Sequence, residues 1–239
     1  MTSSLFQLNE DPTWFPSPEY ALEQPPGLLA IGGDLTFQRL YNAYLNGIFP
    51  WFNDDEPILW WSPDPRAVIP MNQLRINKSL RKFLKRCDYE VSINMAFEKV
   101  IEACAEPRDE NEGTWILPQM QGAYIELHKQ NHAHSIEIWQ GDELVGGLYG
   151  VLIGGCFCGE SMFSKKPNTS KLALIVLQDV LSDVFAAFID CQLPNPHLMN
   201  MGAVLISREL FLQNLKLASK SSMPKTKFSP KFIEWRSMI

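Results

Sequence analysis

The polar residues that most clearly suggest chemistry lie in the apolar segment Phe188–Gln192, which contains Asp190, Cys191 and Gln192. On a β-strand, alternate side chains share a face, so the carboxylate of Asp190 and the amide of Gln192 would converge while Cys191 points the other way. This pattern suits a site that orients a reacting group, and it disfavours Cys191 as a nucleophile. The alternative is that both polar side chains bind nearby loop backbone.

A second acidic candidate, Glu160, lies in the segment Gly159–Ser164. Strand alternation places Glu160 on the same side as Met162, which would put an acid beside an apolar pocket. His134 and His197 are candidates for a general base, since imidazole titrates near neutral pH. Nothing adjacent in the sequence singles out either histidine.

The metal-binding and nucleotide-binding patterns are incomplete. Cys156-x-Cys158 and His132-x-His134 each supply two ligands, whereas a zinc site needs three or four. The glycines of 146–150 lie inside a predicted strand with no helix after it, and there is no Walker A motif. We therefore expect no metal and no nucleotide cofactor.

The elements that must position these residues begin with a hairpin. Residues 135–139 and 144–153 are predicted as strands joined by the turn 140–143, and residues 156–163 as a third strand. A helix is predicted over 168–184, and because it is apolar on two faces, one face can pack on the sheet while the other lines a cavity. The two faces are Leu174, Leu177 and Leu181, and Leu172, Val176 and Val180.

The remaining patterns predict shorter elements. Thr36 and Gly47 bound the one clear helix of a segment rich in proline and aromatic residues, and Asn94 is expected to cap another helix. The other expected elements are a basic helix from Ser79, a strand near 89–93, a helix over 119–130, strands over 187–192 and 204–207, and a helix over 208–217 before a basic tail.

Composition is typical of a folded protein, with 46% hydrophobic and 20% charged residues in 239. The uncharged apolar run Leu144–Gly159 has 16 residues and six glycines, whereas a membrane span needs about 20 apolar residues. The first residues lack the basic start and apolar core of a secretory signal. Five cysteines at irregular spacings favour reduced thiols. We expect a cytoplasmic protein with no membrane partner.

The net charge of −6 disfavours a general nucleic-acid coat, yet the bases are clustered. Six bases and no acid lie between Arg75 and Arg86, and six more lie between Lys216 and Arg236 against Glu234 alone. Such blocks can bind a polyanion locally, and the alternative is a solvated helix face.

Seven blocks of the chain, spread in order over roughly Phe15 to Glu209, together resemble the bacterial leucyl/phenylalanyl-tRNA–protein transferases. Two segments depart from the family pattern. Residues 106–111 are longer and more acidic, and residues 200–203 differ in composition. The matching blocks are Gly27–Leu35, Gly47–Phe52, Leu59–Arg66, Glu112–Ile116, His132–Ser135, Gly159–Ser164 and Asp190–Gln192.

The resemblance implies an α+β fold. A small N-terminal Pro/aromatic-rich domain, residues 1–66, would precede a larger GNAT-like domain, residues 67–239, with a mixed β-sheet, flanking helices and a basic C-terminal tail. It also implies an aminoacyltransferase that moves leucine or phenylalanine, with some methionine, from charged tRNA to the N-terminal α-amine of proteins beginning with arginine or lysine. This transfer would mark the acceptor for degradation under the N-end rule.

Carried over by motif, Asp190 and Gln192 would be catalytic, Glu160 would contact polar reacting or acceptor groups, and Trp51 and Trp115 would hold the terminal adenosine of the tRNA. An aminoacyl ester is already activated, so orientation of the amine can supply about 7–11 kcal/mol. A carboxylate with a pKa of about 3.9 is a poor base for an α-amine near 7.7–8.0, which favours Asp190 polarising Gln192. Asp190 as the direct base is the alternative if burial raises its pKa.

The transferred side chain needs a deep apolar slot, and the RNA end needs stacking surfaces and cations. One methylene changes binding by about 1–3 kcal/mol, so some methionine would be accepted. The slot candidates are Leu148, Met162, Leu174, Leu177, Leu181 and Ile189, and the phosphate-contact candidates are Arg81, Lys82, Lys85, Arg86 and Lys165.

Two other function classes remain as alternatives. An acyl-CoA N-acetyltransferase shares the implied fold class, but its phosphate loop needs glycines and residues 164–171 contain none. A non-catalytic RNA-binding protein would account for the basic blocks but not for Asp190 and Gln192. We expect the chain to act as a monomer.

Overall fold

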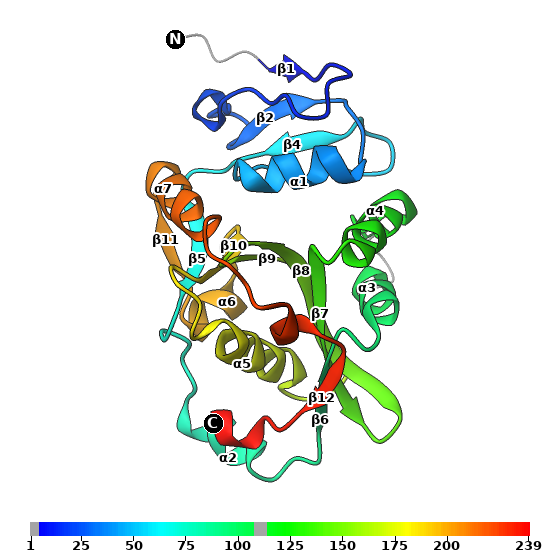
Figure 1. Ribbon diagram of the computed structural model, residues 1–239, viewed down its shortest axis with the longest axis vertical. Coiled ribbons are helices and arrows are strands. Elements are labelled where there is room, and N and C mark those ends of the chain that lie inside the picture. The colour runs from blue at the N-terminus through cyan, green and yellow to red at the C-terminus, as the bar shows by residue number, and fades with distance from the viewer. Residues whose placement is uncertain (1–4, 108–113) are drawn as a thin grey trace.

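The computed structural model describes residues 5–107 and 114–239, which form two β-sheets arranged along the long axis of the molecule (Figure 1). The smaller sheet has the strand order β1-β2-β4-β3. Helix α1 (Phe37–Leu45) lies between this sheet and the larger one (Figure 1). The strands of the smaller sheet are β1 (Phe6–Gln7), β2 (Leu28–Ile31), β3 (Phe49–Pro50) and β4 (Leu59–Trp61).

The larger sheet is mixed and has the strand order β11-β5-β10-β9-β8-β7-β6-β12. Strands β9 and β10 pair in parallel, and the other neighbouring pairs are antiparallel. Its strands are β5 (Arg66–Pro70), β6 (Glu90–Ile93), β7 (Ala133–Gln140), β8 (Glu143–Ile153), β9 (Cys156–Ser164), β10 (Phe188–Gln192), β11 (Val204–Ile206) and β12 (Lys231–Ile233).

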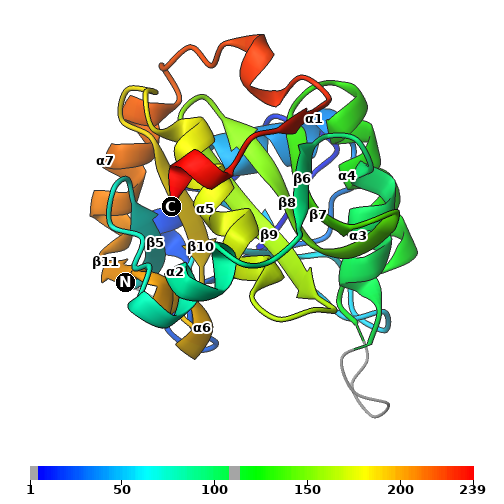
Figure 2. The ribbon, with the colours of Figure 1, turned by 90° about the horizontal axis from the view of Figure 1, so that it is seen from below.

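The larger sheet separates two hydrophobic clusters, one on each face. The first cluster joins α1, α3, α4 and α7 to one face, and the second joins α2, α5 and α6 to the other (Figures 1 and 2). The α-helices of this region are α2 (Lys78–Leu84), α3 (Phe97–Ala105), α4 (Pro118–Lys129), α5 (Thr169–Leu181), α6 (Pro196–Met201) and α7 (Arg208–Ala218). The 3₁₀ turns are η1 (Pro18–Tyr20), η2 (Lys225–Phe228) and η3 (Arg236–Met238).

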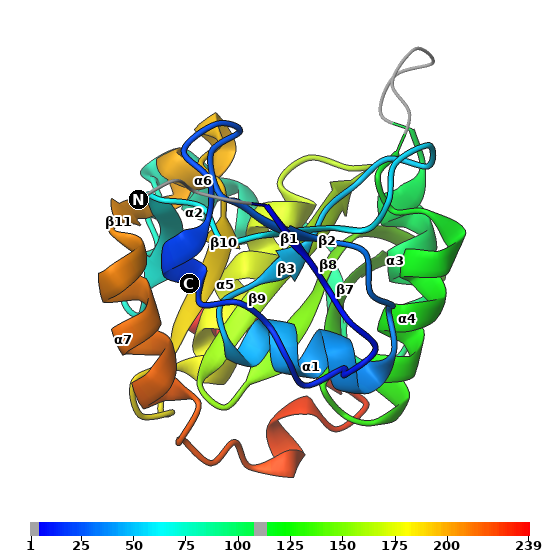
Figure 3. The same cartoon turned by 90° about the horizontal axis from the view of Figure 1, so that it is seen from above.

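These observations confirm the predicted α+β class, with a small N-terminal sheet and a larger mixed sheet flanked by helices. The hairpin β7–β8 and the following strand β9 are confirmed, as are the helix bounded by Thr36 and Gly47 and the other predicted helices. Helix α5 is buried on both of its apolar faces, as predicted. The division into domains at residues 66 and 67 stays a prediction, since the first hydrophobic cluster contains residues of both sheets. Figure 3 shows the strands of the small sheet lying over the large sheet.

Two predictions of local structure are wrong. Asn94 does not cap α3, which starts after Ala96 without a side-chain cap. Asn94 has a left-handed backbone (φ 54°), and its amide oxygen accepts from the Ser135 N–H at 2.8 Å, so it fastens β6 to β7 instead. The C-terminal segment is more than a basic tail, because β12 pairs with β6 and Trp235 is buried.

Within residues 5–107 and 114–239, the structure contains no helix with both the length and the apolar character needed to cross a membrane.

Arg66, the first residue of β5, ties the two sheets together. Its Nε and Nη2 atoms donate to both carboxylate oxygens of Asp190 on β10, at 2.8 and 2.7 Å, and its Nη1 donates to the Gly47 carbonyl at 3.2 Å. The guanidinium also lies 5.0 Å from the ring centre of Phe49 and 4.3 Å from that of Phe211. Because both charges are buried, each needs the other to offset the free-energy cost of its removal from water.

The turn that presents the Gly47 carbonyl requires glycine. Residue 47 has a φ of 74°, and a Cβ atom there would lie 2.7 Å from Leu212 and 2.8 Å from Phe211. The turn after α1 can therefore approach α7 and accept the hydrogen bond from Arg66 only without a side chain.

Replacement of Arg66 by methionine should destabilise the protein by about 3–5 kcal/mol, because it leaves the Asp190 carboxylate buried without a partner. Equilibrium unfolding in urea measures this loss. Lys227→Met is the matched control, since it breaks an ion pair with the exposed Asp183 whose loss should cost at most about 1 kcal/mol. Equal losses in the two variants would contradict this account of the Arg66 pair.

Candidate active site

A cavity of about 900 Å³ opens where β9 and β10 separate. The parallel pairing of these strands covers only Cys156–Cys158 with Phe188–Asp190, although β9 continues to Ser164. Beyond Cys158 and Asp190, β9 and β10 no longer pair with each other. The lining of the cavity includes residues of β8, β9, β10, α5 and α6. The early end of the parallel pairing is therefore what makes room for a ligand.

The apolar side of this cavity contains most of the residues predicted for a slot. Leu148, Met162, Leu174, Leu177 and Ile189 all line it.

Leu181 was also predicted for the slot, and that prediction is wrong because Leu181 does not line the cavity. It lies four residues beyond Leu177, about one further turn along α5, and is fully buried in the second hydrophobic cluster. The cavity ends before that turn.

Glu160 lies at the polar side of the cavity and is held by a chain of hydroxyl groups. The hydroxyl of Tyr124 on α4 donates to Glu160 Oε2 at 2.7 Å, and the hydroxyl of Tyr44 on α1 lies 2.7 Å from that of Tyr124. Among the described residues, Glu160 Oε1 has no hydrogen-bond partner. One carboxylate oxygen is thus fixed through Tyr124 by the first α-helix of the chain, and the other is buried without a partner among the described residues.

Burial raises the pKa of Glu160 to about 7. The hydroxyls of Tyr124 and Tyr44 oppose this rise by donating to the carboxylate, while the negative charge of Asp190 adds to it. Glu160 therefore titrates in the pH range where an α-amine also exchanges its proton.

Asp190 and Gln192 contact each other, but not in the way that strand alternation predicts. A β-bulge lies between them, and Gln192 has a left-handed backbone (φ 54°), so the expectation that they share a face of a regular strand is wrong. Gln192 lines the cavity together with Cys191, whereas Asp190 does not line it and faces Arg66. The Gln192 N–H donates to Asp190 Oδ1 at 3.0 Å, which links the two residues through the backbone.

Neither Cys191 nor His134 is suited to act as a base or nucleophile near neutral pH. Burial raises the pKa of the Cys191 thiol far above its ordinary value, so it stays protonated. Burial lowers the pKa of His134 to about 3, and the ring stacks on Phe228, 4.2 Å away, outside the cavity. His197 does line the cavity.

The residues predicted to contact RNA fall into two groups. Trp115 and Lys165 line the cavity, and Lys165 forms an ion pair with Glu106 at 3.0 Å. Trp51 is 42% exposed and does not line the cavity; its ring lies 5.6 Å from that of Trp61. Glu112 and Gly113, from one of the matching blocks, lie outside the described residues.

The four other phosphate-contact candidates lie in and directly after α2, at the end of the molecule opposite the small sheet (Figure 1). All four side chains are exposed, and none lines the cavity. They are Arg81, Lys82, Lys85 and Arg86.

Three residues near the site were not assigned a role from the sequence, namely Arg66, Tyr44 and Tyr124. The sequence does contain an indication for Arg66, because this base directly precedes the apolar run Ala67–Pro70. A charged residue beside a buried strand is expected to have a partner of opposite charge. Tyr44 and Tyr124 occupy apolar positions of predicted helices. No sequence pattern distinguishes a tyrosine whose hydroxyl forms a hydrogen bond at the site from a tyrosine that only packs in the core.

A mixed sheet whose strands separate over an apolar cavity with an acid and an amide on its polar side fits the class of group-transferring enzymes. The comparisons with known proteins agree. A family model described as leucyl/phenylalanyl-tRNA protein transferase matches residues 68–216, and the model of the N-terminal domain of that family matches residues 33–64.

Full-length relatives support the same family. The chain is 56% identical over 214 residues to a leucyl/phenylalanyl-tRNA–protein transferase of Shewanella piezotolerans, which covers 90% of this chain and 91% of the relative. It is 49% identical over 236 residues to the protein of that name from Colwellia psychrerythraea, and this alignment covers 97% of this chain and 98% of the relative. The chain belongs to the leucyl/phenylalanyl-tRNA–protein transferase family, and the resemblance drawn from its motifs is confirmed.

Among solved structures, the fold is similar to that of L-PGS from Bacillus licheniformis, with a TM-score of 0.37 and 14% identity over 85% of this chain and 65% of that one.

The raised pKa of Glu160 gives a pH-dependent stability of defined sign. The folded state holds the proton up to about pH 7, whereas the unfolded chain releases it near the ordinary value of 4.5. The stability that the protonated Glu160 contributes to the folded state is therefore complete below pH 4.5 and is lost as the pH rises through 7.

Glu160→Gln, which stays neutral and can still accept from Tyr124, should gain stability relative to the original protein as the pH rises from 5 to 8. Urea unfolding at a series of pH values measures this difference. Glu126→Gln, which changes an exposed carboxylate, should show no such trend. Parallel pH profiles for Glu160→Gln and the original protein would contradict the assignment.

Proposed function

We propose that this chain transfers leucine or phenylalanine, with some methionine, from charged tRNA to the N-terminal α-amine of proteins that begin with arginine or lysine. The observation that carries the proposal is the cavity, which places the amide of Gln192 and the carboxylate of Glu160 beside an apolar slot. The product would be marked for degradation by its new N-terminal residue. The reaction takes place in the cytoplasm, where charged tRNA is found, and the chain acts there as a monomer.

The donor side of the reaction needs a slot for an apolar side chain that is not branched at Cβ. Leu148, Met162 and Ile189 face this slot from the sheet, and Leu174 and Leu177 from α5. Their packing would exclude side chains branched at Cβ by shape, because close-packed walls do not relax freely. A methionine side chain differs from leucine by little volume, so it would be admitted at a lower rate.

The amine attack uses orientation as its main source of acceleration. The amine nitrogen forms a bond to the ester carbonyl carbon, the carbon–oxygen bond to the ribose breaks, and one proton passes from nitrogen to the departing ribose oxygen. Gln192 would hold the amine for this attack, and the vicinal ribose hydroxyl would carry the proton. Orientation of this kind supplies about 7–11 kcal/mol.

Asp190 would act through Gln192 and not as the base. Both of its carboxylate oxygens already accept from Arg66, and Oδ1 also accepts from the Gln192 N–H. These contacts favour the polarising role over direct proton abstraction. Asp190 then fixes the bulge that directs Gln192 into the cavity.

Glu160 would contact the cationic acceptor residue. It is an acidic group of the cavity with one carboxylate oxygen free of partners among the described residues. An arginine or lysine side chain of the acceptor would favour the ionised form of Glu160, so binding of the acceptor and loss of the proton would be coupled.

The RNA end would bind at Trp115 and Lys165 on the cavity, with Trp51 as a second stacking surface. Stacking of a base on an aromatic side chain contributes about 1–3 kcal/mol. The cations of α2 would contact phosphates of the donor farther from its 3′ end.

The direct experiment follows labelled phenylalanine from charged tRNA to a peptide that begins with lysine. We expect label on this peptide and none on its N-acetylated form, since acetylation removes the attacking amine. Binding of charged tRNA without transfer to either peptide would overturn the proposal and favour a non-catalytic RNA-binding protein.

Gln192→Ala and Asp190→Ala should each lower the transfer rate by about 100-fold or more, the range seen when a single orienting group is removed from an active site. Affinity for charged tRNA should stay within a few-fold, because Gln192 is assigned to the attacking amine and Asp190 does not line the cavity. Gln130→Ala changes an exposed glutamine directly after α4 and serves as the matched control. Unimpaired transfer by both site variants would contradict this assignment of the site.

Lys82 lies within α2 and Lys85 directly after it. The double variant Lys82→Glu, Lys85→Glu should raise the KM for charged tRNA and make this KM less dependent on salt. Each lost phosphate contact reduces the slope of log affinity against log salt by about 0.9. Transfer kinetics at several salt concentrations measure both effects. No change in either quantity would show that these side chains form a solvated face only.

A further inference from the structure

The last residues of the chain fold back onto the segment that follows the basic helix α2. The indole N–H of Trp235 donates to the Tyr89 carbonyl at 3.0 Å, and Nη2 of Arg236 donates to the Cys87 carbonyl at 2.9 Å. Trp235 is 2% exposed, while Arg236 is exposed and lies 4.7 Å from the Trp235 ring centre. The buried tryptophan thus fixes the position of the exposed arginine.

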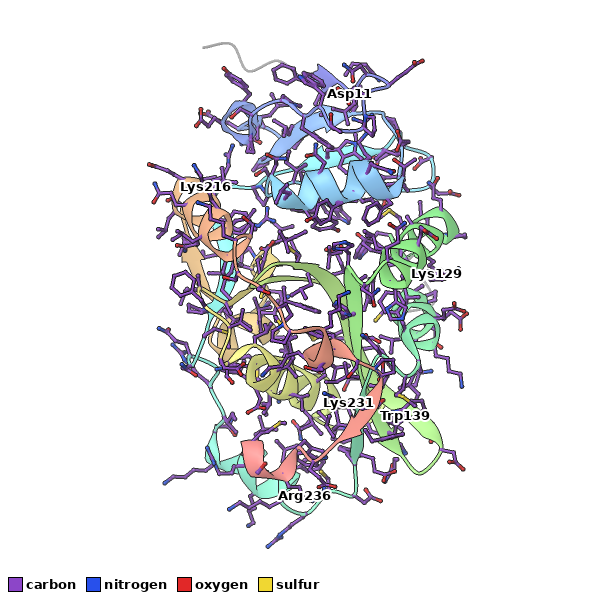
Figure 4. The ribbon with its side chains drawn as sticks, in the orientation of Figure 1. Asp11, Lys129, Trp139, Lys216, Lys231 and Arg236 are labelled. Atoms are coloured by element: carbon purple, nitrogen blue, oxygen red, sulfur yellow. The ribbon has the colours of Figure 1, made fainter. Side chains whose placement is uncertain are left out.

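This contact brings two basic regions of the sequence to one end of the molecule. Arg236 lies beside α2 at the end opposite the small sheet, and the C-terminus is drawn next to that helix (Figures 1 and 4). Arg86, the last base of the first block, precedes Cys87, to which Arg236 is bonded. We call the group formed by Arg81, Lys82, Lys85, Arg86 and Arg236 the basic end.

The acids near the basic end do not cancel its charge. Asp88, Glu90 and Glu234 are exposed nearby in the sequence, and Asp88 accepts two hydrogen bonds from the amide of Gln140, at 3.0 and 3.2 Å. Five cations against three acids leave the region positive in a chain whose net charge is −6. A local excess of this kind attracts a polyanion and not a neutral partner.

A link also runs from the basic end to the rim of the cavity. The Tyr89 hydroxyl donates to the Pro167 carbonyl at 3.3 Å, in the loop that joins β9 to α5. That loop carries the exposed Lys165 and Lys166, and Lys165 lines the cavity. Tyr89 therefore holds the C-terminal segment through its carbonyl and the cavity rim through its hydroxyl.

We propose that the C-terminal segment is part of the RNA-binding surface, and that Arg236 contacts a backbone phosphate in the duplex part of the donor RNA beyond its 3′ end. This inference rests on the proposed function for the nature of the RNA. The family model ends at residue 216, so it does not include this segment. A guanidinium carries five N–H donors, and the bond to Cys87 engages Nη2, which leaves a charged, oriented group at the surface.

The test uses Arg236→Gln in the full-length protein, with deacylated leucine tRNA as the probe. Glutamine loses the charge but keeps an N–H group that can donate to the Cys87 carbonyl. One phosphate contact contributes about fivefold to affinity at about 0.15 M salt, so we expect a loss of about that size and a salt dependence less steep by about 0.9. Arg236→Lys should bind nearly as well as the original protein.

Lys216→Gln is the matched control, because Lys216 belongs to the same basic block of the sequence but lies on α7, away from the basic end (Figure 4). It should leave affinity and salt dependence unchanged. Binding of the isolated trinucleotide CCA should also be unaffected by Arg236→Gln, since this probe has no duplex.

Amide hydrogen exchange over Lys231–Ile233 separates a charge effect from a structural one. We expect β12 to stay protected in Arg236→Gln. An unchanged salt dependence, or a loss of affinity accompanied by loss of this protection, would overturn the inference. Failure of aminoacyl transfer in the original protein, with tRNA binding still dependent on Arg236, would instead overturn the proposed function alone.

Discussion

The ion pair between Arg66 and Asp190 is the interaction on which the rest of the structure depends. Two buried charges are tolerated only when their hydrogen bonds are satisfied, and here the guanidinium serves both carboxylate oxygens, the Gly47 carbonyl and two aromatic faces. The Arg66 side chain therefore fixes three parts of the fold to one another, namely β5, β10 and the turn after α1. The small sheet is placed over the larger one by an electrostatic requirement as well as by apolar packing.

The same pair determines which groups are free to do chemistry. Both carboxylate oxygens of Asp190 accept hydrogen bonds from Arg66, and Oδ1 also accepts from the Gln192 N–H beside the bulge. In the proposed mechanism, Asp190 therefore acts through Gln192, which lines the cavity. Glu160 is left as a buried carboxyl with a pKa near neutral and one oxygen without a partner among the described residues. The proposed transfer from an activated ester to the neutral α-amine of a cationic acceptor residue would use both groups, the amide on β10 and the acid on the neighbouring β9.

The parts of the fold that follow from regular periodicity could be predicted from the sequence. Strand alternation gave the hairpin β7–β8, and two apolar faces on α5 indicated a helix between a sheet and a cavity. The bulge after Asp190 could not be predicted, because alternation assumes a regular strand, nor could the exact turn at which the cavity ends before Leu181. The docking of Trp235 depends on a carbonyl that is 146 residues away in the sequence, and no local pattern encodes such a contact.

A double-mutant cycle between Asp190 and Gln192 tests most directly whether Asp190 acts through Gln192. Single-turnover transfer rates are measured for Asp190→Asn, Gln192→Ala and the double variant. If the carboxylate works by positioning the amide, its replacement has nothing further to remove once the amide is gone, and the double variant should transfer within about threefold of Gln192→Ala. Multiplication of the two single losses in the double variant would contradict this account, because it would show that Asp190 contributes independently of Gln192.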